Sequence, residues 1–335
     1  MLHRLSSAIV LLVVVISHDA QAYRGDQIYA SPGERIDIGH RKLNLYCTGK
    51  GTPTIVLESG LGGRASAWAR VQPVLSKTAK VCSYDRAGYA FSDPGPRPRP
   101  AERLVADLHA ALVRGKVQGP YILVGATFGA FVVRLFAARH PGDVGGMVLL
   151  NPSPEEEELT TASATVERID REGLQHAKAC RDAAARGKLE QNGAKAKDCL
   201  PGVNPEFSPQ LNAARIAMLR KSATWSALVS EWEAIRESAA EVTAASAKTF
   251  GFPLVVISAG REGELQGTPV DKADLHDAWR HWTAWQDDIA RISTDSLHMR
   301  TKDDSRAAET TDPALVIAAI QKVIAAARNH KTLAP

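Results

Sequence analysis

The segment Tyr121-Ile-Leu-Val-Gly-Ala-Thr-Phe-Gly-Ala130 decides the fold class, because a short apolar run passes directly into a helical pattern through a Gly-x-x-x-Gly turn. Its first residues predict a buried strand, and the helical periodicity begins at Phe128. Gly125 and Gly129 would let the strand and the helix approach closely. Thr127, between them, would occupy a strained conformation that raises its side chain above the edge of the sheet. This context is typical of a nucleophile elbow.

On both sides of this turn, short β-rich runs alternate with longer amphipathic runs, which predicts a mostly parallel sheet with helices on both faces. We expect eight strands, at residues 35–38, 43–47, 54–58, 81–84, 121–124, 147–150, 253–258 and 296–300. We expect helices at 101–114, 128–139 and 312–327. Together these elements predict one α/β domain formed by residues 23–151 and 250–335.

Residues 152–249 differ from the rest, since they are polar, rich in Ala, Glu and Lys, and helical in period. We interpret them as a helical insertion. The insertion opens with an acidic run at 155–158, and most of its charges are expected to be solvated helix faces.

The composition of the 335 residues, 44% hydrophobic and 23% charged, excludes a disordered or fibrous protein. The net charge of +4 comes without a basic stripe with interleaved aromatics, so we expect no nucleic-acid partner. Residues 1–22 predict a secretory signal, with a basic start, an apolar run at 8–16 and an Ala20-Gln21-Ala22 cleavage site. That run is shorter than the roughly 20 residues of a membrane-spanning helix. We therefore expect a periplasmic or extracellular protein with no stable membrane span, an uncleaved anchor being the alternative.

Four cysteines fit an exported chain, where disulfides persist. Cys180 and Cys199 both fall in the insertion, so the economical pairing joins them and leaves Cys47 with Cys82. Four buried free thiols are the alternative. No pair has the C-x-x-C spacing of a zinc or redox site, and we expect neither a metal nor a cofactor.

The chain resembles the α/β-hydrolase superfamily, especially hydrolases with a G-H-S-x-G elbow and a Y-D-R-x-G-x-x-x-S segment. Besides the elbow, the resemblance rests on Glu58-Ser-Gly-Leu-Gly-Gly63 and Ser83-Tyr-Asp-Arg-Ala-Gly-Tyr-Ala-Phe-Ser-Asp93, and it covers about residues 39–151 and 252–327. It implies that the insertion is a lid and that the Ser83–Asp93 segment forms the floor of the site. It also implies an oxyanion hole formed by the backbone N–H groups of Leu61 and Phe128.

The chain departs from the family at the nucleophile and the base of the catalytic triad, and at one of the two positions possible for the acid. Thr127 replaces the nucleophilic serine. The general base, a histidine seven residues before the proline of the final helix, is replaced by Arg306, which cannot accept a proton. The acid that orients the base would be Asn151, which carries no charge, or Glu262.

The remaining histidines of this region offer no obvious substitute base. His298 lies early in the last strand, far from the site if the strand stays extended, and we expect a structural or surface role. His276 and His281 accompany Trp279 and Trp282 on a predicted helix, so we expect them to pack.

Our leading hypothesis is an exported, catalytically impaired pseudohydrolase that binds a small acyl or carboxylate ligand. Arg306, Thr127 and the N–H groups of Leu61 and Phe128 would supply the donors for an anion. The alternative is an active carboxylic-ester hydrolase with Thr127 as nucleophile. A third hypothesis is a protein that binds a partner through the insertion, and a large exposed apolar patch on residues 152–249 would favour it.

Overall fold

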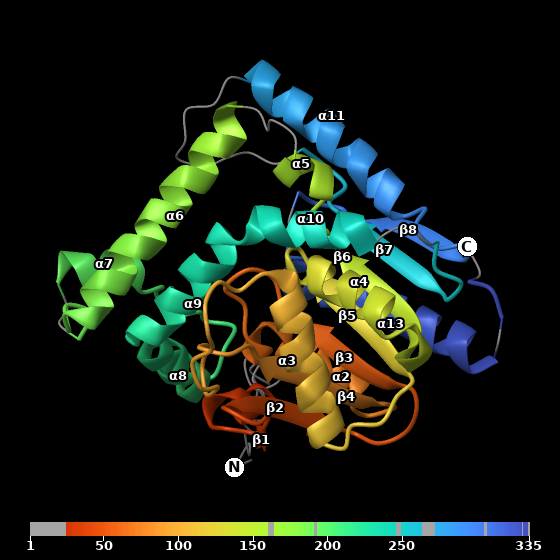
Figure 1. The fold of residues 1–335 in the computed structure, drawn as a ribbon, viewed down its shortest axis with the longest axis horizontal. Helices are drawn as coiled ribbons and strands as arrows, with labels where there is room; N and C mark the ends of the chain where they lie inside the picture. Colours follow the sequence, from red (N-terminus) through yellow and green to blue (C-terminus); the bar gives the residue numbers. More distant parts are fainter. Residues whose placement is uncertain are drawn as a thin grey trace, which may run out of the picture.

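A computed structural model describes residues 25–159, 164–190, 193–245, 249–262, 272–304, 307–329 and 331–333. The chain forms an eight-stranded sheet in the order β1-β2-β4-β3-β5-β6-β7-β8, with helices on both faces (Figure 1). The strands are β1 (Glu34–Asp37), β2 (Lys42–Thr48), β3 (Thr54–Glu58), β4 (Lys80–Asp85), β5 (Tyr121–Ala126), β6 (Val144–Leu150), β7 (Leu254–Ser258) and β8 (Ser296–Arg300). β2 is antiparallel to both β1 and β4, and all other pairs are parallel. The predicted fold class is confirmed.

Two hydrophobic cores hold the helices to the two faces of the sheet. One face is covered by α3 (Ala101–Arg114), α4 (Gly129–Arg139), α10 (Ile235–Ala245) and the end of α11 (Lys272–Ile289). The other face is covered by the short helices η2 (Ala65–Trp68) and α2 (Gln72–Leu75) and by α13 (Pro313–Asn329). The short helices η1 (Asp26–Ala30), η3 (Pro141–Asp143) and α12 (Ala308–Thr311) complete the domain. None of the described helices is long and apolar enough to cross a bilayer.

The start of β6 shows where the sequence pattern was insufficient. We expected this strand to begin at Met147, but it begins three residues earlier, at Val144. Gly145 and Gly146, which resemble strand breakers, lie inside it. A Cβ at Gly146 would lie 2.4 Å from Val323 Cγ1, so the glycine permits the close packing of α13 on the sheet.

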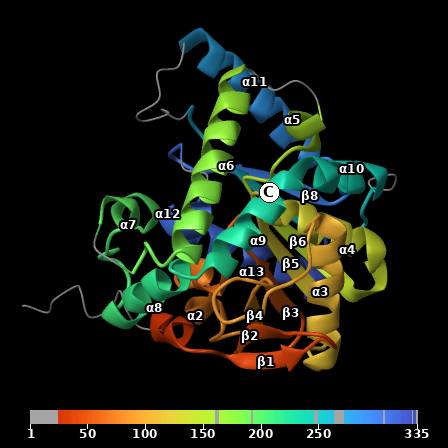
Figure 2. The same cartoon turned by 60° about the vertical axis from the view of Figure 1, so that its left-hand side comes forward.

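Helices follow one another between β6 and β7, where we expected a helical insertion. They are α5 (Glu155–Leu159), α6 (Ala164–Ala185), α7 (Ala194–Cys199), α8 (Pro209–Leu219), α9 (Ser222–Glu233) and α10. In Figure 2, α6 to α9 form a group beside the sheet, and α6 and α9 share a small hydrophobic core.

Both predicted disulfide pairings are confirmed. Cys180 pairs with Cys199 and fixes α7 to α6. Cys47 pairs with Cys82 across the neighbouring strands β2 and β4, where the two residues face each other in register.

The first residue of the acidic run at 155–158 is an exception to the solvated helix faces expected for most charges of the insertion. Glu155 is buried and accepts hydrogen bonds from both terminal nitrogens of Arg134, at 2.8 and 2.5 Å. The carboxylate thus joins the first helix of the insertion to α4. A single sequence does not show which member of a charge run faces a buried arginine.

Candidate active site

Thr127 lies in the turn between β5 and α4 with a φ of 46°, in the left-handed region. This conformation is strained for a non-glycine residue and most of all for a β-branched one. The turn is fixed by its backbone: Thr127 N–H donates to the Leu150 carbonyl at 2.8 Å, and the Thr127 carbonyl accepts from Ala130 N–H at 2.9 Å. The strained turn expected from the sequence is therefore present.

Three glycines make the tight turn possible. A Cβ at Gly125 would lie 2.5 Å from Val133 Cγ2, and one at Gly129 would lie 2.6 Å from the Ser59 carbonyl oxygen. A Cβ at Gly60 would lie only 2.3 Å from Thr127 Oγ1. The Thr127 hydroxyl therefore packs directly against the α-carbon of Gly60, in the loop that follows β3.

The two residues in contact, Gly60 and Thr127, are each followed in the sequence by a residue whose backbone N–H group could serve as a donor. Leu61 follows Gly60, and Phe128 follows Thr127. Neither N–H group donates a hydrogen bond to another described residue. Both donors are therefore available for the predicted oxyanion hole.

Among the described residues, the side chains of both predicted acid positions have hydrogen-bond partners other than Thr127. Arg306 lies outside the described residues. Asn151, at the end of β6, accepts a hydrogen bond through Oδ1 from Ala259 N–H at 2.7 Å. Glu262 is 3.0 Å from His276 Nδ1. Among the described residues, no imidazole or carboxylate is hydrogen-bonded to the Thr127 hydroxyl.

His298 lies in β8 and contacts two other polar side chains. Its Nε2 is 2.7 Å from Ser258 Oγ and its Nδ1 is 2.9 Å from Asp287 Oδ1. Burial and the charge of Arg300 lower the pKa of His298, which favours the neutral ring. Although this connectivity is that of a Ser-His-Asp triad, Ser258 is fully buried in β7 and out of reach of a substrate. The contacts fit the structural role expected for His298.

The expected packing role of two histidines on α11 is wrong. The side chains of His276 and His281 are 63% and 62% exposed, and they lie beside Glu262 and Asp277. Trp282, one residue further along the helix, is buried. Adjacent helical residues point in directions about 100° apart, so sequence proximity to a buried tryptophan does not imply burial.

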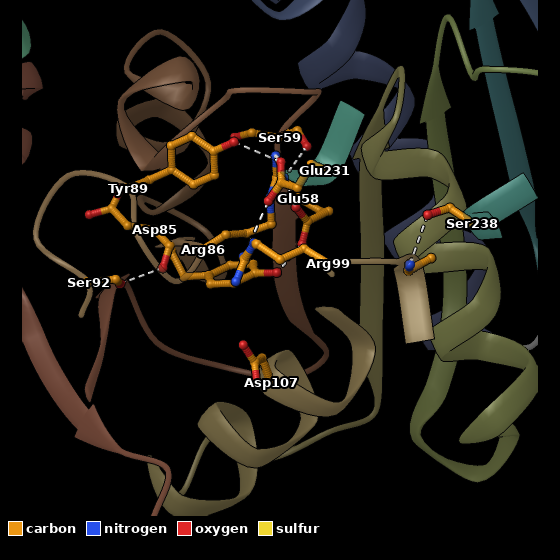
Figure 3. Close-up of polar contacts among 12 residues, drawn as sticks. Glu58, Ser59, Asp85, Arg86, Tyr89, Ser92, Arg99, Asp107, Glu231 and Ser238 are labelled. Atoms are coloured by element: carbon orange, nitrogen blue, oxygen red, sulfur yellow. Dashed lines mark hydrogen bonds and ion pairs between the residues drawn. The ribbon is translucent and has the colours of Figure 1, made fainter. Parts of the chain in front are cut away.

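A buried ionic cluster joins the Gly60 loop to the insertion (Figure 3). Arg86, after β4, donates from Nη1 to Glu58 at 2.5 Å and to the Ser59 carbonyl at 2.7 Å. From Nη2 it donates to the Gly60 carbonyl at 2.7 Å. The carboxylate of Glu231 on α9 accepts from Arg86 Nε and Nη2, both at 3.0 Å.

Two more side chains complete this cluster around Glu231. Tyr89 donates its hydroxyl to Glu231 at 2.9 Å, and Arg99 donates at 3.3 Å. Burial alone would lower the pKa of Arg86, but the charges of Glu231 and Glu58 outweigh it and raise that pKa. Two arginines thus balance two glutamates at the base of the loop.

Sequence reasoning had placed Arg86 in the floor of the site but missed Glu231. The one available signal was its position next to Trp232, within the mostly apolar run that precedes Glu233 on α9. An acidic residue in such a run is a candidate for a buried ion pair.

Comparisons with known proteins agree with this architecture. Residues 53–173 match the family model described as alpha/beta hydrolase fold. The protein YbdG of Bacillus subtilis is 26% identical over 173 residues, which are 50% of this chain and 53% of YbdG. The protein YqjL of the same organism is 30% identical over 128 residues, 38% of this chain and 48% of YqjL. The chain therefore spans about half the length of these curated relatives.

Among solved structures, ALR0039 of Nostoc sp PCC 7120 superimposes with a TM-score of 0.64 at 17% identity. The match covers 87% of this chain and 96% of that one. At this identity the likeness concerns the fold alone. The family match, together with this shared fold, supports membership of the α/β-hydrolase superfamily.

Proposed function

We propose that this protein is an exported α/β-hydrolase whose triad is catalytically impaired and which binds a small acyl or carboxylate ligand. The observation that carries the proposal is the environment of Thr127. Its hydroxyl packs against Gly60 and has no hydrogen-bonded imidazole among the described residues.

The chemistry of the triad explains why this environment matters. A hydroxyl becomes an effective nucleophile when a neighbouring base accepts its proton. Nucleophile and base act as a unit, so losing one member removes most of the contribution of the triad. Here the nucleophile position holds a hindered secondary alcohol, and the base position in the sequence holds Arg306.

The binding part of the proposal is supported by what the elbow retains. The N–H groups of Leu61 and Phe128 remain available as donors, and such donors stabilise a carboxylate as well as an oxyanion. The helices α5 to α10 would act as a lid over this site. Export is supported by the sequence of residues 1–22 and by two disulfides.

Hydrolysis of p-nitrophenyl acetate and butyrate by the mature protein tests the catalytic part. We expect wild type and Thr127→Ala to be equal, and the double variant Thr127→Ser/Arg306→His to gain activity. Turnover by wild type that Thr127→Ala abolishes would contradict the proposal.

That second outcome would support the alternative, an ester hydrolase with Thr127 as nucleophile. The available donors of Leu61 and Phe128 favour it, since they would serve a tetrahedral intermediate. A partner-binding role has less support. Within the described part of the insertion, Val203 is the large hydrophobic residue with an exposed side chain, and a single residue is not a patch.

A further inference from the structure

A cavity of about 250 Å³ lies between the Gly60 loop and the insertion. One wall is formed by the continuation of that loop, from Gly62 to Ala67, and the other by residues in and before α8. Thr310 of α12 closes a third side. The cavity therefore borders the loop that holds Leu61 and contacts Thr127.

Two arginines from different walls line this cavity: Arg64 from the loop and Arg215 from α8. Neither side chain makes a hydrogen bond to a described residue, and neither lies within ion-pair distance of a described carboxylate. The Nε of Arg64 is buried without a partner. A buried guanidinium donor without an acceptor is costly, so its presence needs an explanation.

The electrostatics of the cavity favour an anion over a cation. Burial lowers the pKa of Arg64, and the positive charge of Arg215 lowers it further. The negative charge of Asp85 raises the pKa of Arg64. However, the two carboxylate oxygens of Asp85 already accept hydrogen bonds from Ala65 N–H, the Asn44 side chain and Phe91 N–H. An anion between the two guanidiniums would relieve their repulsion.

The acidic groups next to the cavity wall do not fill this role. Glu206 forms an ion pair with Arg70. Burial raises the pKa of Glu309, beside Thr310, to about 7, so this carboxyl is partly protonated at neutral pH.

The lining also supplies the other features of a carboxylate site. Arg215 lies over the ring of Phe207, 4.8 Å from its centroid, and a stacked guanidinium keeps its edge free for a bidentate acceptor. Ser66, Asn204 and Thr310 add polar side chains. The volume suits a small molecule or the head group of a longer one.

We infer that this cavity binds a small dicarboxylate through Arg64 and Arg215. The inference rests on the proposed function, because it places the charge of the proposed ligand in this cavity beside the elbow.

Isothermal titration with succinate, and with the neutral succinamide, tests the inference. We expect wild type to bind succinate and not succinamide. Arg64→Met and Arg215→Met should each weaken succinate binding about tenfold or more, because each removes a charge-assisted contact. Arg186→Met, which removes an exposed arginine from the turn after α6, should change nothing.

The thermal midpoint of each variant is measured first. If Arg64→Met does not fold, the inference is tested with Arg215→Met and Arg215→Lys instead. The lysine variant should retain part of the affinity for succinate, since it keeps the charge without the planar fork.

Three results would overturn the inference: no succinate binding by wild type, equal binding of succinamide, or undiminished binding in both arginine variants. The third would leave the proposed function standing. Ester hydrolysis by wild type would instead contradict the proposed function. Weaker succinate binding by the arginine variants would then still support the binding site inferred for this cavity.

Discussion

Glu231 on α9 and Arg86 after β4 form a fully buried, two-pronged ion pair, with Nε–Oε1 and Nη2–Oε2 distances of 3.0 Å each. Because Arg86 also holds the carbonyls of Ser59 and Gly60, the pair connects the insertion directly to the loop at the elbow. One carboxylate on the proposed lid therefore binds the arginine that holds the loop of the proposed oxyanion hole.

Glu231→Gln should lower the free energy of unfolding by about 3 kcal/mol, because it leaves Arg86 and Arg99 buried with too little negative charge. The same helix provides the control. Glu233 is half exposed and pairs with Lys178, so Glu233→Gln should cost no more than about 1 kcal/mol. Urea denaturation of both variants measures the difference, and equal losses would show that the buried cluster is not a major source of stability.

Because Thr127 and Gly60 are in contact, the effect on stability of a substitution at one position should depend on the residue at the other. Gly60→Ala should cost about 1–3 kcal/mol, because its new methyl group would meet Thr127 Oγ1. In a Thr127→Ala background the same change should cost much less, since the nearest remaining atom is the Ala126 carbonyl oxygen at 3.4 Å. Thermal or urea denaturation of the four proteins in this cycle gives the coupling energy. Additive effects would mean that the two residues do not touch as described.

The buried carboxyl group of Glu309 should make the free energy of unfolding fall as the pH rises. Burial raises its pKa from 4.5 to about 7. The folded state therefore binds this proton more tightly than the unfolded state does, and the resulting stability is lost as the pH rises from about 4.5 through 7.

Glu309→Gln should consequently raise the free energy of unfolding at pH 8, by up to about 3 kcal/mol, and change it little at pH 4. Glu237→Gln on α10, whose side chain is exposed, is the control and should show no such pH dependence. Urea denaturation at the two pH values checks this. A Glu309→Gln effect that is the same at both would contradict the raised pKa.

The sequence was sufficient for the sheet and the turn because these depend on local patterns. Apolar runs and glycine spacing predicted all eight strands, two of them with the observed bounds, β3 and β8. The disulfides were also predictable, since Cys180 and Cys199 are close in sequence and Cys47 and Cys82 lie on short predicted strands.

The buried charges were not predictable, because their partners are distant in sequence. Glu231 meets Arg86 across 145 residues. Arg64 and Arg215 come together only once α8 packs beside the Gly60 loop. A single sequence marks each of these residues as an ordinary charge, and only the fold shows which of them are balanced.

The measurement that tests the central claim most directly is covalent trapping of Thr127. The mature protein is incubated with an alkyl fluorophosphonate, which reacts with an activated hydroxyl at an elbow, and its intact mass is recorded beside that of Thr127→Ser/Arg306→His. The account predicts no adduct on wild type and one adduct on the double variant. An adduct on Thr127 of wild type would contradict it and show that an unrecognised base activates the threonine.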